Sequence, residues 1–145
     1  IHKLKELIQI NLDCEVSPIT GIENDSTLDV PSEKLRQIVE LLLTEYGHIH
    51  LSAITAQQRD DTFDTIAVLY HFWAGSGFSL VAELDANSPR VASITKLIAG
   101  ADFFEREAAE LFGITFSGRE STPPLLLPED WDQGPPFRKP EVDNG

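Results

Sequence analysis

Residues 63–84 read FDTIAVLYHFWAGSGFSLVAEL, and this stretch predicts two long β-strands joined by a tight turn. Every second residue is apolar from Ile66 to Phe72 and again from Phe78 to Leu84. Because successive side chains of a strand point to opposite faces, each strand has one face to bury. Gly75-Ser76-Gly77 predicts the turn. The alternate residues of the first strand are also largely apolar, so we expect that strand to be central and its second face to be covered by another element or by a partner.

The segments before this hairpin add a third long strand and a helix. Residues 48–55 predict a strand with Ile49, Leu51 and Ala53 on one face. Pro31-Ser32-Glu33 predicts a helix start, and Gly47 predicts its end. Between them the apolar residues follow helical spacing and form one stripe, made by Leu35, Ile38, Val39 and Leu42.

The remaining elements complete an α+β pattern. Residues 1–12 predict a short amphipathic helix, and residues 14–30 predict two short strands joined by a turn between Glu23 and Ser26. A last helix is expected over residues 102–112. The order helix, two strands, helix, three strands, helix predicts a two-layer sandwich, with an antiparallel sheet of about five strands and helices on one face. We expect residues 1–116 to form this core and residues 117–145, which hold six of the nine prolines, to form an extended tail.

Composition excludes several classes of function. Eleven Lys and Arg against 24 Asp and Glu give a formal net charge of −13, which argues against binding to nucleic acid or to an anionic membrane surface. Apolar stretches such as Ile66–Tyr70 are far shorter than the roughly 20 residues of a membrane-spanning helix. Cys14 is the single cysteine, so this chain alone builds no multi-cysteine metal site. The chain opens on Ile1 and has no methionine, so we expect the native start to be missing.

The helix over residues 102–112 carries most of the charged candidates. Asp102 and Glu105 have the spacing of a capping box, and Gly113 is placed to end the helix. Arg106 lies four residues from Asp102 and from Glu110, which predicts an acid–base–acid ladder, and the ordinary interpretation of such a ladder is a solvated helix face. The expected buried stripe is Phe104, Ala108, Leu111 and Phe112.

This helix and the tail resemble a known family. The run Ala101–Phe116, followed by Leu127–Trp131 and Gly134–Lys139, is similar to the signature of the thirty-kilodalton subunit of respiratory NADH dehydrogenase, which is the C subunit of NADH-quinone oxidoreductase. The family signature consists of an Asp-aromatic-aromatic-Glu-Arg-Glu helix, a Phe-Gly-Ile that ends this helix, and a late Pro-Leu-Arg-Lys segment, which here is Pro136-Phe137-Arg138-Lys139. The resemblance extends from about Val30 to Lys139. The tail sequence Leu125–Trp131 is at least as similar to the homologous subunits of energy-converting nickel–iron hydrogenases.

The resemblance implies a non-catalytic assembly subunit of the hydrophilic arm of a complex-I-like oxidoreductase, which docks the large quinone-site subunit and has other hydrophilic-arm subunits as further partners. The alternative is the equivalent subunit of a membrane-bound hydrogenase. Either way we expect no catalytic, cofactor-binding or metal-binding residue in this chain; NAD, quinone, FMN and iron–sulfur clusters, or nickel–iron, would belong to the parent complex. The expected location is cytoplasmic and peripheral, on the cytoplasmic side of the cell membrane, with membrane contact only through the complex.

The expected interface with the large subunit lies on the last helix and the tail. A tail rich in proline loses less conformational entropy on docking than a flexible one, and tryptophan and arginine are enriched at interface hot spots. The alternative is a disordered terminus with incidental aromatic residues. The candidate interface residues are Glu105, Arg106, Glu107, Glu110, Trp131, Phe137, Arg138 and Lys139.

A function of a different class stays open, namely an autonomous module that binds a ligand or a metal. His48, His50 and His71 are potential metal ligands if neighbouring strands bring them together. Paired carboxylates for acid–base work are less favoured, because Glu107 lies on a different side of the helix from Glu105 and Glu110. An autonomous module predicts thermal stabilisation of the isolated protein by its ligand.

Overall fold

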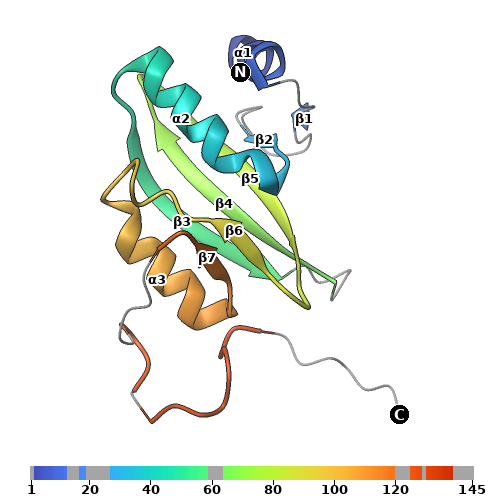
Figure 1. Cartoon of the computed structure of the whole chain (residues 1–145), viewed down its shortest axis with the longest axis vertical. Coiled ribbons are helices and arrows are strands. Elements are labelled where there is room, and N and C mark those ends of the chain that lie inside the picture. The colour runs from blue at the N-terminus through green and yellow to red at the C-terminus, as the bar shows by residue number, and fades with distance from the viewer. Residues whose placement is uncertain are drawn as a thin grey trace.

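The computed structural model describes residues 2–12, 17–18, 27–58, 64–119, 125–128 and 130–138. Figure 1 shows an α+β chain in which helices pack on a sheet. In sequence order the elements are α1 (His2–Leu12), β1 (Ser17–Pro18), β2 (Thr27–Asp29), a 3₁₀ turn (Ser32–Lys34), α2 (Leu35–Tyr46), β3 (His50–Gln58), β4 (Thr65–Trp73), β5 (Gly77–Asp85), β6 (Arg90–Ala92), α3 (Ala101–Phe112) and β7 (Thr115–Ser117).

The predicted hairpin forms the centre of the main sheet. Strands β4 and β5 pair antiparallel along their whole length, from Trp73 opposite Gly77 to Thr65 opposite Asp85. Gly75, with φ +79°, lies in the turn and takes a backbone conformation that favours glycine. The apolar alternation is confirmed, because Ile66, Val68, Tyr70 and Phe72 are all buried on one face. Strand β4 has β3 on one side and β5 on the other, as expected for a central strand.

One strand pairing differs from the fully antiparallel sheet predicted from the sequence. The strand order is β1-β2-β5-β4-β3, and β2 runs parallel to β5, with Leu28 opposite Leu80. The cause is the helix between β2 and β3. Helix α2 carries the backbone back along the sheet, so β2 and β3 point in the same direction, as in any helical crossover. Two antiparallel steps through β4 then make β5 parallel to β2 as well.

Helices α2 and α3 lie on the same side of the sheet, and β6 and β7 lie between them (Figure 1). The predicted stripe of α2 is confirmed: Leu35, Ile38, Val39 and Leu42 are buried in the core. Gly47, with φ +70°, ends the helix and donates its N–H to the Leu43 carbonyl at 2.9 Å. Helix α1 is also confirmed and buries Leu4 and Ile8 in the same core. The turn expected between Glu23 and Ser26 lies outside the described residues.

A β-bulge changes the phase of β3. The register moves from Leu51 opposite Phe72 to Ala53 opposite His71, so Ser52 is an extra residue in the strand. Leu51 and Ile54 are therefore both buried, as is Gln58 at the end of the strand, and Ala53 lies on the other face. The prediction that Leu51 and Ala53 share a face was wrong, because strict alternation holds only where no residue is inserted.

A second, two-stranded sheet was not anticipated. Strands β6 and β7 pair parallel, with Val91 opposite Phe116, and both of these side chains are buried. Strand β7 spans residues 115–117 and thus crosses the boundary at 116/117 that the sequence suggested between core and tail. That division of the sequence stays a prediction.

Candidate functional site

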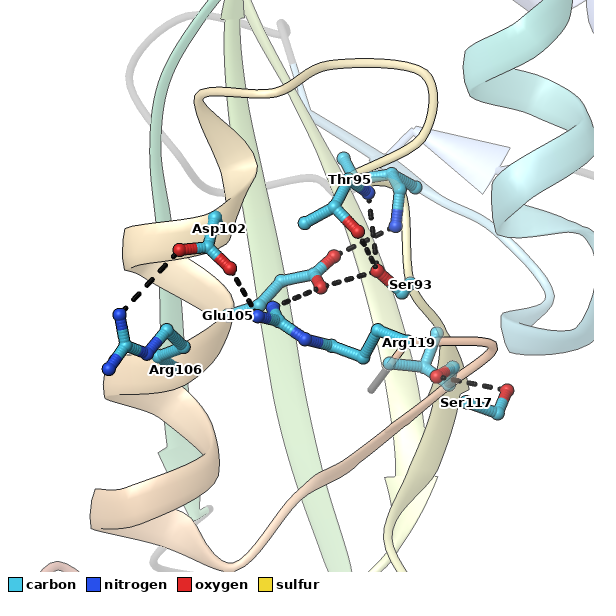
Figure 2. A network of polar contacts seen from close by, with 9 residues as sticks. Ser93, Thr95, Asp102, Glu105, Arg106, Ser117 and Arg119 are labelled. Atoms are coloured by element: carbon cyan, nitrogen blue, oxygen red, sulfur yellow. Dashed lines mark hydrogen bonds and ion pairs between the residues drawn. The ribbon is translucent and has the colours of Figure 1, made fainter. Parts of the chain in front are cut away.

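Glu105, in the middle of α3, is completely buried. Its carboxylate accepts three hydrogen bonds, from Ser93 Oγ at 2.6 Å, the Ile94 N–H at 2.8 Å and Arg119 Nη1 at 3.0 Å. Figure 2 shows the carboxylate pointing away from its helix toward Ser93 and Arg119. A buried carboxylate is tolerated only when its lone pairs and its charge are satisfied, and these donors satisfy both.

Arg119 joins this buried group to the helix surface. Its side chain is only 14% exposed, and its second nitrogen, Nη2, bonds the Asp102 carboxylate. Asp102 also pairs with Arg106, at 3.7 Å. The network thus ties the first two turns of α3 to the residues that follow β7 (Figure 2).

The predicted capping box is wrong. Helix α3 begins at Ala101, its N-terminal flanking residue is Gly100, and no side-chain group caps it. Asp102 already lies within the first turn, so its carboxylate is directed to arginine instead of to free backbone N–H groups. The buried residues of the helix are Ala101, Glu105 and Ala108, whereas Phe104, Leu111 and Phe112 of the predicted stripe are only half-buried.

Tyr70, on the buried face of β4, points its hydroxyl into the same interior. Within the described part of the sequence, this hydroxyl is buried without a hydrogen-bond partner. Burial raises the pKa of Tyr70 far above its ordinary value, and the negative charge of Glu105 raises it further. Tyr70 therefore stays neutral beside Glu105.

The tail folds back on the last turns of α3. Glu110, expected to continue the charge ladder with Arg106, accepts the backbone N–H groups of Leu125 and Leu126, the latter at 2.6 Å. Further along, the Phe137 N–H donates to the Leu111 carbonyl at 2.9 Å. Two separate points of the tail are therefore bonded to the carboxyl end of one helix.

Side-chain contacts also hold the tail against the end of α3 and against the end of β5. The rings of Phe112 and Phe137 meet edge to face with centroids 5.7 Å apart. Arg138 Nη2 donates to the Ala86 carbonyl, just after β5, at 2.8 Å. Gly113 has φ +73°, and a Cβ there would come within 2.8 Å of Pro135 Cγ. The absence of a side chain at position 113 lets the tail approach the helix end closely.

Two predicted anchors remain accessible in this seated tail. Trp131 is 39% exposed and Phe137 57% exposed. The indole N–H of Trp131 donates to the Gly134 carbonyl at 2.7 Å. The apolar ring is therefore available to a partner while its polar atom is already satisfied.

The other predicted interface residues are distributed differently. Glu107 is half-buried on α3, and Arg106 is one-quarter exposed beside Asp102. Glu105 has no accessible surface and Arg138 bonds a carbonyl of this same chain, so both make their contacts within the chain. Lys139 lies outside the described residues. An interface role for these residues stays a prediction.

The histidines do not come together as a metal site. His71 Nε2 lies 3.1 Å from Thr55 Oγ1, and Nδ1 lies 2.8 Å from Ser79 Oγ. Among the described residues, no three His, Cys, Asp or Glu side chains converge to hold a metal ion. Within the same residues, no helix has the length and apolar character needed to cross a membrane.

Sequence comparisons relate the chain to respiratory subunits. It is 51% identical over 155 aligned positions to the J subunit of NAD(P)H-quinone oxidoreductase from Prochlorococcus marinus (strain MIT 9211), covering 96% of this chain and 74% of that protein. It is 30% identical to the C subunit of NADH-quinone oxidoreductase from Moorella thermoacetica, covering 94% and 90%. The match to the same subunit of Roseiflexus sp. (strain RS-1) is 38% identical over 81 residues, so it spans 56% of this chain and less than half, 46%, of that relative.

Two solved structures share the fold. A structure described as the membrane-bound sulfane sulfur reductase, an archaeal respiratory membrane complex, aligns with a TM-score of 0.64 at 19% identity, over 82% of this chain and 71% of that one. Nqo5, described as a trypsin-resistant fragment (1–134), aligns with a TM-score of 0.60 at 22% identity, over 83% and 97%. At these identities the likeness concerns the fold alone, an open sandwich.

The family itself is defined by the match that covers most of the sequence. Residues 28–143 match the family model of the respiratory-chain NADH dehydrogenase 30 kDa subunit. This range includes the buried Glu105 network, α3 and the seated tail. The resemblance inferred from the sequence is thereby confirmed, and the chain belongs to the family of the 30 kDa subunit of respiratory-chain NADH dehydrogenase.

Proposed function

We propose that this chain is a non-catalytic assembly subunit in the hydrophilic arm of a complex-I-like NADH-quinone oxidoreductase, and that it docks the large quinone-site subunit through its tail. The observation that carries the proposal is the seating of the tail on α3, with Trp131 and Phe137 left accessible. The names of the Moorella and Roseiflexus relatives support a place in a quinone oxidoreductase.

Preorganisation is the physical advantage of this arrangement. A free tail must lose conformational entropy when it docks, and that loss subtracts from the affinity. Here Glu110 holds the backbone of Leu125 and Leu126, while Leu111 and Ala86 hold Phe137 and Arg138. Part of the ordering cost is therefore met within the subunit before the partner arrives.

The buried charges have a positioning role in this proposal. Arg119 lies two residues after β7 and is bound by Glu105 and Asp102, so the backbone leaves the core in a fixed direction. The tail begins from this fixed point and then reaches Glu110 on the same helix. Glu105 thus serves docking from inside the subunit, without touching the partner.

The name of one further relative supports the proposal that the partner is the large subunit. A Rhodopseudomonas palustris (strain BisA53) protein, whose name combines the C and D subunits of NADH-quinone oxidoreductase, is 47% identical over 60 residues, 10% of its length. A name that joins C with D in one protein fits a chain that lies beside the D subunit.

We extend the proposal to cofactors and location. NAD, FMN, quinone and iron–sulfur clusters are held by other subunits, and the complex places this chain on the cytoplasmic side of the membrane.

Co-purification from the native host tests the docking role. A tagged protein with Arg106→Ala, Trp131→Ala and Arg138→Ala should recover the large subunit at least about tenfold less than wild type, because loss of one central anchor costs about 2 kcal/mol. Tyr46→Ala removes an exposed aromatic residue of α2 and should leave recovery unchanged. Equal recovery by the triple variant and wild type, at matched expression, would remove the tail from the interface.

Two measurements separate the proposal from its alternatives, a hydrogenase subunit and an autonomous ligand-binding module. A co-purifying large subunit with four cysteines for nickel would assign the chain to a hydrogenase. An autonomous ligand-binding module predicts that a metal, a nucleotide or a quinone raises the melting temperature of the isolated protein, whereas an assembly subunit predicts no such shift.

A further inference from the structure

We infer that Trp131 binds a cationic side chain of the large subunit, an arginine, which stacks on the indole ring and pairs with the carboxylates of Asp130 and Asp132. We call residues 130–134 the Trp131 loop. The inference rests on the proposed function, because it names the chemical group of the partner that the tail binds. It differs from the ordinary expectation for an exposed aromatic ring, which is an apolar pocket on the partner.

The indole ring of Trp131 is held within its own loop. The ring N–H donates to the Gly134 carbonyl at 2.7 Å, and the backbone N–H of Trp131 donates to the Pro128 carbonyl at 3.0 Å. Gly134 has φ +74°, a backbone conformation that favours glycine. The ring nevertheless stays accessible. A partner therefore meets an aromatic ring that is already positioned, and the ring N–H needs no acceptor from the partner.

The two aspartates beside this ring in the sequence carry unmatched charge. Asp130 and Asp132 are exposed, and within the described part of the sequence neither side chain has a hydrogen bond or an ion pair. The sequence between Arg119 and Arg138 contains no lysine or arginine. Arg119 itself is bonded to carboxylates of α3, and Arg138 donates to the Ala86 carbonyl. The negative charge of the Trp131 loop is therefore left for a partner to neutralise.

An exposed indole ring beside unmatched negative charge selects a cation. The face of an aromatic ring is negative, and tryptophan attracts a cation more strongly than tyrosine or phenylalanine does. Arginine fits better than lysine, because its planar guanidinium group stacks on a ring and its several N–H groups can serve both carboxylates. An apolar pocket would cover the ring but leave both charges without complementary charge on the partner.

Charge also opposes two other occupants of the Trp131 loop. A second copy of this chain carries a formal net charge of −13, so two copies repel each other. An anionic lipid surface is repelled in the same way. Phe137, the other accessible ring of the tail, differs from Trp131, because its ring already meets that of Phe112 and its neighbours in the sequence are Pro136 and Arg138. The cationic contact is therefore assigned to Trp131 alone.

Co-purification of the assembled complex, through a tag on this chain, tests the carboxylates. Asp130→Asn/Asp132→Asn keeps the ring and removes both charges, so it should lower recovery of the large subunit by about two- to tenfold. Glu40→Gln/Glu45→Gln removes two charges from exposed positions of α2 and should leave recovery unchanged. Added salt should release the large subunit more steeply from wild type than from the aspartate variant. Equal recovery and equal salt dependence for the two double variants would overturn the inference.

Two substitutions of the ring separate a cation from an apolar pocket. Trp131→Phe keeps an aromatic face and Trp131→Leu keeps an apolar side chain, while both remove the hydrogen bond to Gly134. A cationic partner predicts that the phenylalanine variant recovers at least about threefold more large subunit than the leucine variant. Equal recovery by these two variants is the result expected of an apolar pocket, and it would contradict the inference.

Failure of this inference is distinguishable from failure of the proposed function. If the triple variant of Arg106, Trp131 and Arg138 retains the large subunit, the tail is not the interface and both proposals fail. If the triple variant loses the large subunit while Asp130→Asn/Asp132→Asn retains it, the docking role stands and the cationic partner is wrong.

Discussion

Glu105 Oε1 accepts a hydrogen bond from Arg119 Nη1 at 3.0 Å, and this contact joins the middle of α3 to the start of the tail. The Glu105 side chain is completely buried, and that of Arg119 is largely buried. The pair therefore couples the stability of the core to the direction in which the backbone leaves it. The first prediction follows from that coupling.

Arg119→Ala should lower the free energy of unfolding by about 3–5 kcal/mol, because it leaves the Glu105 carboxylate buried without its counter-charge. Glu105→Gln combined with Arg119→Ala should cost less than the sum of the two single changes, since the double variant has no unpaired charge. Urea unfolding measures all three. Arg90→Ala, at an exposed position of β6, is the control and should change stability by no more than about 0.5 kcal/mol. Additive effects of the two changes would contradict a coupled pair.

Gly113→Ala should detach the tail from α3, and Gly47→Ala should not. Both glycines have positive φ, +73° and +70°, so alanine is strained at each by about 1–2 kcal/mol. Only at Gly113 would the new Cβ meet another segment, with Pro135 Cγ 2.8 Å away. We expect faster hydrogen exchange of the Phe137 amide in Gly113→Ala alone. Equal protection of that amide in the two variants would show that Gly113 does not hold the tail.

Tyr70→Phe should leave the free energy of unfolding unchanged or raise it by up to about 1 kcal/mol. The Tyr70 hydroxyl is buried without a partner among the described residues, so its removal takes away a desolvated polar atom and keeps the ring. Tyr70→Ala, which also removes the ring, should cost about 3–5 kcal/mol. A large loss of stability in Tyr70→Phe would reveal a hydrogen bond to that hydroxyl.

Stability should fall as the pH drops below about 7, in part because of His71. Burial lowers the pKa of His71 from its ordinary value near 6.5. Between that value and the lowered one, the unfolded state binds the proton more readily than the folded state, so protonation favours unfolding. Urea unfolding from pH 8 to pH 5 should give a shallower pH dependence for His71→Gln than for wild type. His50→Gln controls for loss of a histidine, and parallel curves for His71→Gln and wild type would contradict the prediction.

Glu105 illustrates what a sequence pattern misses. Its spacing from Ala101 and Ala108, four and three residues, places it on the buried stripe of α3, and that spacing was visible in the sequence. A charged residue in such a pattern is ordinarily assigned to the solvated face. The donors that make its burial possible come from Ser93, Ile94 and Arg119, which no local pattern connects to the helix.

The sequence alone determined the elements whose signal is local and repetitive: the hairpin of β4 and β5, the stripe of α2, the extent of α3 and the family signature. Alternation and helical spacing report which side of an element is apolar, and that information lies within a few residues. Only the tertiary structure decided the parallel pairing of β2 with β5, the bulge at Ser52, and the seat of the tail, where Arg138 reaches a carbonyl 52 residues away. These features depend on contacts between distant segments, and such contacts have no period along the sequence.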